Sequence, residues 1–419
     1  MTKQPRILIQ CDLNLNVFWV GILFFSLVAC SRIDALLPPV QEDSASNTVP
    51  AMEDLGLMHV TFPTVPGWKE DDHSAALPPF LRSCKKIVNL APQKPLGESN
   101  LMGTINDWRS ICRDGELVRP GNKVDAQYFF ESRFKAYMAL SPKGNIGTFT
   151  GYYEPELRGA WKADTQFKVP IYARPKDIIV ANLGKFDDRW KSEKIVGHLV
   201  EGEFSPYYDR AAIETGALRG RQLEILWVDD AVDAFFLHIQ GSGRIKLPDG
   251  TYIRLGYDGR NGQRYTPVGR ELVAAGVLRL KDVTMPSIRH WMMENPVAAQ
   301  AVMRKNRSFI FFKVLKGSGP IGAQGLELTP GRSLAIDRKF IPFGIPIWLD
   351  TTEPGTKPAN PLRRLVIAQD TGSAIKGPIR GDFFWGHGAA AGEKAGIMNQ
   401  PGRYYLLLPR KLNTKSAPE

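Results

Sequence analysis

The pattern of apolar and polar residues changes several times along the chain. An almost wholly apolar run covers residues 17–29. Residues 125–138 carry apolar side chains at helical spacing, which predicts one amphipathic helix. From about residue 147, short apolar runs alternate with glycine and proline, a texture typical of barrels that are built from short strands.

A helical segment at 266–304 separates two groups of predicted strands. A chain of 419 residues is long for one ordinary domain, and this arrangement favours two domains or one domain with a large insertion. The predicted strands are 148–153, 169–172, 223–228 and 234–240 in the first group, and 309–313, 333–337, 345–349, 365–370 and 404–408 in the second.

The apolar run is too short for an ordinary membrane span and has the length of a signal-peptide core. It ends in Leu-Val-Ala-Cys, which resembles the cleavage box of bacterial lipoproteins, so Cys30 is the predicted lipidation site. Ser31 follows where an aspartate would be the usual inner-membrane retention signal, and this resemblance implies an outer-membrane lipoprotein that faces the periplasm. The alternative is an uncleaved N-terminal anchor. We predict a signal peptide at 1–29 and a flexible tether at 30–58.

The charge of the chain limits its candidate binding partners, and its cysteines and histidines bear on disulfide formation and metal binding. The 54 basic and 43 acidic residues give a net charge of +11, which favours an anionic partner: nucleic acid, anionic lipid or an acidic polymer. The alternative is a soluble protein that happens to be basic. Nucleic acid is disfavoured, because the chain has no dense Lys/Arg run and no nucleic-acid module signature. An export signal implies an oxidising compartment, in which Cys84 and Cys112 can pair, but they could equally be two buried thiols. The six histidines lack metal-ligand spacing, so we predict no metal and no cofactor.

The densest group of candidate chemical residues lies at 368–388. Asp370 and Asp382 stand twelve residues apart, with glycines between them and the aromatic run 383–385 after them. Apolar contacts raise a carboxyl pKa, and a general acid needs such a pKa to stay protonated near neutrality. The simpler alternative is that both aspartates only bond backbone amides in turns.

Three further groups are less specific. In the sequence HIQGSG, Gln240 and Ser242 flank a glycine and could bond sugar hydroxyls or acetamido groups. Tyr152 and Tyr153 precede a glutamate, although an ordinary core strand would have the same appearance. Residues 257–262 contain Asp-Gly and Asn-Gly pairs, which most simply form a turn.

Together these residues resemble the membrane-bound lytic murein transglycosylase A family. The matching stretches are FTGYYEPEL at 149–157, HIQGSG at 238–243, YDGRNGQRY at 257–265, NRSFIFF at 306–312, AIDRKFIPFGIPI at 335–347 and the long run at 368–396. The resemblance implies a mainly β fold with helical segments. In it, a double-psi β-barrel catalytic domain formed by 59–155 and 307–419 would be interrupted by a substrate-binding β-barrel domain at 156–306. A groove between the two domains would hold the glycan.

The resemblance also implies an activity: lytic cleavage of the β-1,4 bond between N-acetylmuramic acid and N-acetylglucosamine in peptidoglycan. The product end would be 1,6-anhydro-N-acetylmuramic acid. One acid suffices for this reaction, because the sugar's own tethered 6-hydroxyl replaces the water or second carboxylate that a hydrolase needs. Asp382 aligns with the acid/base position, and Asp370 aligns with a second aspartate in the site.

The family's binding residues carry over to this sequence in the same way. Their implied positions in the groove are Tyr152, Tyr153, Gln240, Ser242 and Asp337, with Lys376 and Arg380 holding lactyl or peptide carboxylates. The implied partners are peptidoglycan strands and outer-membrane lipid, for a monomer that could join cell-wall enzyme complexes.

Two other functions compete with this interpretation. Residues 365–374 mimic an aspartic-peptidase strand that ends in Asp-Thr-Gly, but that chemistry needs two such aspartates and this chain has one Asp-Thr-Gly. A non-catalytic peptidoglycan-binding lipoprotein would keep the basic charge and the groove without needing a buried acidic pair.

Overall fold

The computed structural model describes residues 55–98, 100–191, 193–317 and 319–412. The predicted signal peptide, Cys30 and most of the tether lie outside these ranges. The tether ends earlier than residue 58, because β1 (Gly56–Val60) pairs with β2 (Phe134–Leu140) and buries Leu57. Within the described ranges, no helix has both the length and the apolar character that a membrane crossing requires.

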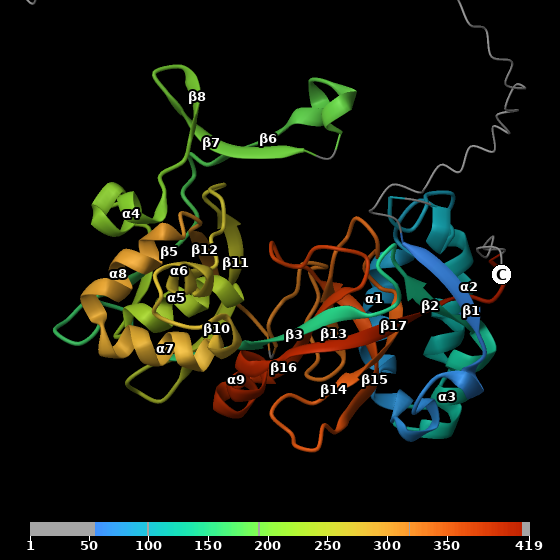
Figure 1. Cartoon of the computed structure of the whole chain (residues 1–419). Coiled ribbons are helices and arrows are strands. Elements are labelled where there is room, and N and C mark those ends of the chain that lie inside the picture. The colour runs from blue at the N-terminus through green and yellow to red at the C-terminus, as the bar shows by residue number, and fades with distance from the viewer. Residues whose placement is uncertain (1–54, 99, 192, 318, 413–419) are drawn as a thin grey trace, which may run out of the picture. The chain divides into compact units, whose positions relative to one another are not determined.

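Six strands close into a barrel (Figure 1). The sheet order β17-β14-β15-β13-β16-β3 returns to its start, because β3 pairs with both β16 and β17. The strands are β3 (Gly147–Glu154), β13 (Ser333–Ile336), β14 (Pro346–Thr352), β15 (Pro361–Asp370), β16 (Arg380–His387) and β17 (Asn399–Pro409). This closed barrel, with a second β-domain inserted into it, confirms the predicted mainly β fold class.

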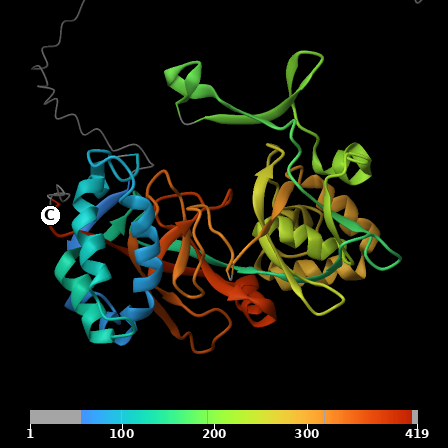
Figure 2. The same ribbon diagram turned by 180° about the vertical axis from the view of Figure 1, so that it is seen from behind.

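Helices cover one side of this barrel, as Figures 1 and 2 show in blue to cyan. They share one apolar core with β14, β15 and β17, in which Phe80, Trp108 and Trp348 have no exposed surface. The helices are α1 (Leu77–Ile87), α2 (Ile105–Glu116) and α3 (Lys123–Arg133), and α9 (Gly388–Ile397) packs separately against β3 and β16. Cys84 and Cys112 form a disulfide that joins α1 to α2.

The single helix predicted over 125–138 is wrong. Helix α3 ends at Arg133, and Phe134 already has extended backbone angles. Residues from Phe134 onward pair with β1 on one side and β17 on the other. The apolar residues in this range therefore belong partly to the buried face of a short helix and partly to the start of a strand. In the second part, hydrogen bonds to the neighbouring strands outweigh the local helix propensity.

The inserted domain has its own six-stranded sheet, in the order β12-β11-β10-β4-β9-β5. A single bridge from Ala173 to Phe312 brings the two edges of this sheet together. The strands are β4 (Glu156–Ala160), β5 (Val169–Tyr172), β9 (Glu224–Val228), β10 (Ser242–Lys246), β11 (Tyr252–Arg260) and β12 (Ile310–Leu315). Because β12 pairs with β11, the sheet continues to Leu315, later than the insertion end predicted at residue 306.

Helices and a small sheet complete the insertion. The helices are α4 (Arg210–Ala212), α5 (Ala231–Gln240), α6 (Val268–Ala274), α7 (Met285–Glu294) and α8 (Pro296–Lys305), and the three-stranded sheet is β6 (Ile179–Asn182), β7 (Lys194–Val200) and β8 (Glu203–Pro206). The strand predicted at 234–240 is wrong, because these residues lie in α5. The Asp230 side chain caps that helix, which buries Leu237 against the strands and Phe236 against the other helices. A helix buried on opposite sides gives the same continuous apolar run as a strand.

Removing the disulfide should destabilise the first barrel and its helices. We expect the double variant Cys84→Ala/Cys112→Ala to lose roughly 3–4 kcal/mol of unfolding free energy, because the bond closes a loop with a sequence separation of 28. Urea unfolding with and without dithiothreitol measures this loss. The reductant should weaken the wild type and leave the variant unchanged; an equal response of both would contradict the expectation.

Candidate active site

Four residues lie in register across four neighbouring strands of the barrel. Ala335 of β13 stands opposite Asp370 of β15 on one side and Asp382 of β16 on the other. Asp382 in turn stands opposite Thr150 of β3. The fold thus places two aspartates that are twelve residues apart in the sequence on either side of one small residue.

Strand spacing sets the separation of this pair. Two inter-strand steps place the backbones of Asp370 and Asp382 roughly 10 Å apart. Ala335, which is 3% exposed, stands between them in the register. The two carboxyls are close enough that the charge on Asp382 contributes to raising the pKa of Asp370.

Asp370 is half-buried and held by the backbone. The amides of Ala323 and Thr371 donate to its Oδ1 at 2.8 and 2.9 Å. Burial raises the pKa of Asp370 to about 6, although these amides oppose the shift by favouring the charged form. The carboxyl therefore changes its charge close to neutral pH.

Asp382 is also half-buried, and it has a different kind of partner. The hydroxyl of Thr150 donates to its Oδ1 at 2.6 Å, and the guanidinium of Arg380 donates to that hydroxyl at 2.8 Å. Burial raises the pKa of Asp382 above its ordinary value, while the Thr150 hydrogen bond and the Arg380 charge partly offset this rise. Such a carboxyl can be protonated at a pH where an exposed aspartate is not.

Tyr152 lies next to both aspartates. It follows Thr150 by two residues on β3, so both side chains project from the same face of the strand. Its ring contacts Phe384 at a centroid distance of 5.1 Å. Burial, with the negative charges of Asp370 and Asp382, raises the pKa of the Tyr152 phenol well above its usual value. The phenol remains protonated and can donate a hydrogen bond.

The side chain of Asp337, the third predicted aspartate, accepts hydrogen bonds from two backbone amides. Its Oδ1 accepts from the amide of Lys339 at 3.2 Å and its Oδ2 accepts from the amide of Gly377 at 2.9 Å. The residue is 7% exposed. It therefore ties the loop after β13 to the loop that leads into β16.

The remaining predicted residues divide between the two domains. Gln240 of α5 accepts a hydrogen bond at 3.2 Å from the backbone amide of Tyr153 in β3. The Tyr153 ring packs closely on Gly392 of α9, where an added Cβ would come within 2.8 Å of the ring. Ser242 is half-buried at the start of β10, and Lys376 is exposed in the loop before β16.

Besides its hydrogen bond to Thr150, the Arg380 side chain makes hydrogen bonds to the protein backbone. One guanidinium nitrogen donates to the carbonyl oxygens of Thr148 and Gly381. A sequence pattern cannot reveal these contacts, because the partners are either adjacent or about 230 residues away. Thr150 has a direct bond to Asp382 and was missed for the same reason, although it lies within the FTGYYEP motif.

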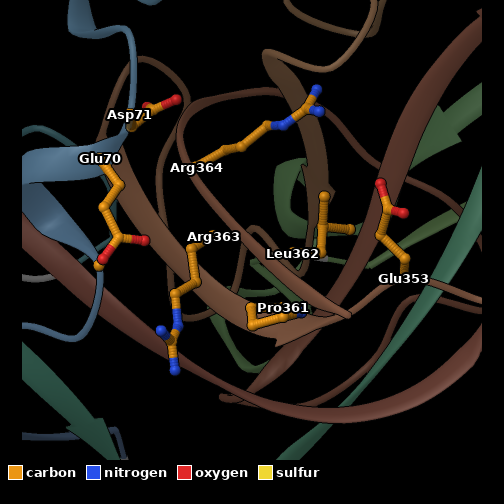
Figure 3. Close-up of a pocket in the computed structure, with 8 residues that line it drawn as sticks. Glu70, Asp71, Glu353, Pro361, Leu362, Arg363 and Arg364 are labelled. Carbon is orange, nitrogen blue, oxygen red and sulfur yellow. The ribbon is translucent and has the colours of Figure 1, made fainter. Parts of the chain in front are cut away.

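A cavity elsewhere in the barrel does not include these residues. It has a volume of about 280 Å³, and Figure 3 shows charged side chains around it. It is lined by Gly67, Glu70, Asp71, Glu353, Pro361, Leu362, Arg363 and Arg364. Asp71 is paired with Arg332, and Arg363 is paired with Asp350.

The described part of the chain holds no group of three or more His, Cys, Asp or Glu side chains arranged to bind a metal ion. The carboxyls of Asp370 and Asp382, whose pKa values are raised, can offer proton transfer.

Solved structures of similar proteins share this architecture. A membrane-bound lytic murein transglycosylase from Agrobacterium tumefaciens is 35% identical, with a TM-score of 0.76, over 85% of this chain and 98% of that one. MltA from Neisseria gonorrhoeae is 32% identical, with a TM-score of 0.71, over 86% and 93%. A curated relative from Vibrio cholerae, named membrane-bound lytic murein transglycosylase A, is 30% identical over 270 residues, which are 63% of this chain and 66% of the relative.

Family models match both domains. Residues 148–313 match the MltA specific insert domain, and residues 332–408 match the 3D domain. The fold is a two-barrel β-protein that carries a pair of half-buried carboxyls. Given these matches and the Agrobacterium structure, the chain belongs to the membrane-bound lytic murein transglycosylase A family.

Neutralising Asp370 should stabilise the fold at neutral pH. Its pKa is about 6 in the folded protein and about 3.9 when unfolded, so its ionisation costs stability above pH 6 and nothing below pH 3.9. We expect Asp370→Asn to raise the unfolding free energy by about 1–2 kcal/mol at pH 7.5, after discounting for partial exposure, and by almost nothing at pH 3.5.

Urea titrations at the two pH values measure this difference. The matched control is Asp188→Asn, at an exposed position, which should change neither titration. A gain in Asp370→Asn that is the same at both pH values would contradict the assigned cause.

Proposed function

We propose that this protein cleaves the β-1,4 bond between N-acetylmuramic acid and N-acetylglucosamine in peptidoglycan without water, with Asp382 as the acid/base. The observation that carries the proposal is the pair of half-buried aspartates across Ala335, in a chain that belongs to a family named for lytic transglycosylation.

The reaction balances with one carboxyl. Asp382 gives its proton to the glycosidic oxygen as the bond from that oxygen to C1 of the muramic sugar breaks. The 6-hydroxyl of the same sugar attacks C1 and returns its proton to the Asp382 carboxylate. The products are an N-acetylglucosamine 4-hydroxyl and a 1,6-anhydro ring, and the enzyme regains its starting protonation state.

We assign the acid role to Asp382 because it aligns with the acid/base position that the family resemblance implies. Two fixed backbone amides donate to Asp370, and donors that cannot reverse their direction favour a charged carboxylate. Asp382 has one donor, the Thr150 hydroxyl, and in both carboxyls these bonds fall on Oδ1, so Oδ2 of either could carry a proton. Asp370, ionised above pH 6, would stabilise the positive charge that develops at C1 in an oxocarbenium-like transition state.

Residues of both domains would hold the glycan in the proposed groove. Tyr152 can donate from its phenol, and Ser242 can bond hydroxyl or acetamido groups. Lys376 is exposed and can hold a lactyl or peptide carboxylate. Gln240 and Tyr153 would act partly through their mutual bond, in which the Tyr153 amide donates to the Gln240 side chain.

We also propose that the protein is an outer-membrane lipoprotein that faces the periplasm and is anchored at Cys30. The support is the apolar run that ends in Leu-Val-Ala-Cys and the serine that follows it. Curated relatives are named membrane-bound. The tether would let a monomeric enzyme reach the cell wall and join other wall enzymes while it remains attached to lipid.

Replacing the proposed acid tests the assignment. Asp382→Asn should lower the release of anhydromuropeptides from purified sacculi by at least about 100-fold, because general acid catalysis is worth roughly 10²–10⁴ in rate. Binding to sacculi should persist in a sedimentation assay, because the amide keeps the shape of the side chain. Near-normal turnover would refute the role of Asp382.

The same assay separates the other candidate functions. A wall-binding protein without activity would sediment with sacculi and release no product in the wild type. An aspartic peptidase would cleave peptide substrates and be blocked by a pepstatin-type inhibitor, whereas the proposed enzyme should be insensitive to it.

The anchor can be tested by fractionation of cells. Cys30→Ala should release the protein from membranes, since no lipid could then be attached. Ser31→Asp should move it from the outer to the inner membrane on a density gradient. Membrane attachment that survives Cys30→Ala would defeat the lipoprotein assignment.

A further inference from the structure

We infer that Thr150 is a positioning residue whose hydroxyl fixes which oxygen of Asp382 carries the transferable proton. The inference rests on the proposed function, because it concerns the acid of that reaction. Thr150 lies on β3, 232 residues from Asp382 in the sequence, and stands directly opposite it in the parallel pairing of β3 with β16.

The direction of the hydrogen bonds follows from the donors available. A guanidinium can only donate, so the bond of 2.8 Å from Arg380 occupies one lone pair of the Thr150 oxygen. The hydroxyl has one hydrogen, and the bond of 2.6 Å directs it to Oδ1 of Asp382. With the Thr150 hydrogen on Oδ1, this oxygen acts as an acceptor, and a proton on the carboxyl then resides on Oδ2.

Arg380 cannot turn easily, which fixes the chain of bonds. Its guanidinium also donates to the carbonyl oxygens of Thr148 and Gly381. All three acceptors belong to β3 and β16, whose pairing is continuous from Thr148 to Tyr152. The rotamer of Thr150 is restricted as well, since a β-branched side chain in a strand has few χ1 states.

The arrangement has two chemical consequences. A donor on Oδ1 stabilises the carboxylate, so Thr150 lowers the pKa of Asp382 and partly offsets the effect of burial. It also aims the free oxygen, Oδ2, in a constant direction. The acid is thus stronger than burial alone would make it, and its proton is held in one place.

A matched set of variants separates this role from simple packing. Thr150→Val removes the hydroxyl and keeps the shape, and Thr150→Ser keeps the hydroxyl. Thr148→Val makes the same change two residues earlier on the same strand, where the side chain is exposed and makes no bond to Asp382. Carbon-13 NMR of carboxyl-labelled aspartate follows the titration, and the signal lost in Asp382→Asn assigns Asp382.

We expect the pKa of Asp382 to rise by about one to two units in Thr150→Val, the size of a lost hydrogen bond to a charged group. Thr150→Ser and Thr148→Val should match the wild type. The alkaline limb of the activity profile, where the acid loses its proton, should move to higher pH in Thr150→Val by a similar amount. The maximum rate should fall there, because the acid is weaker and less well aimed.

The inference is overturned if Thr150→Val leaves the Asp382 titration unchanged, or if Thr150→Ser shifts it as much as valine does. A fall in rate with no movement of the alkaline limb also overturns it, since packing alone would give that result. The NMR titration needs no turnover. If the wild type instead made reducing-end muramic acid, the proposed function would fail, while the titration would still decide the role of Thr150.

Discussion

The alignment of Asp370, Ala335, Asp382 and Thr150 across four strands is the constraint on which the site depends. Because β13 pairs in parallel with β15 and antiparallel with β16, one alanine lies between two carboxyls from different segments of the chain. A one-residue slip of either strand would turn its aspartate to the other face of the sheet. Closure of the barrel fixes this register, since β3 is held by both β16 and β17.

Burial and hydrogen bonding then give the two carboxyls different properties. Both are half-buried, which favours the neutral form, but backbone amides hold Asp370 and a single hydroxyl holds Asp382. Two carboxyls in distinct environments are a common way to obtain distinct acid and base roles near neutral pH. The buried carboxylate of Glu154, where the chain passes from β3 into the insertion, pairs with Arg254 of β11 at 2.5 Å.

Some of this could be predicted from the sequence. Gly/Pro-punctuated short strands, the helical segment and the Asp370–Asp382 spacing were visible as local patterns. The strand predicted at 234–240 failed because a helix buried on opposite sides has the same apolar run as a strand. The helix predicted at 125–138 failed because its second half pairs with β17, a contact more than 260 residues away that no local pattern contains. The roles of Thr150 and Arg380 could not be predicted for the same reason, because their hydrogen-bond partners are adjacent or distant in the sequence. The sequence also cannot show that the carboxylate of Asp337 accepts hydrogen bonds from two backbone amides.

The central claim is that a sugar hydroxyl, and not water, completes the bond exchange beside one protonated aspartate. Digestion of sacculi in water enriched in oxygen-18, followed by mass spectrometry of the released muropeptides, tests it most directly. The account predicts anhydro ends that contain no solvent oxygen. One oxygen-18 atom at the muramic C1 of products made by the purified protein would contradict it.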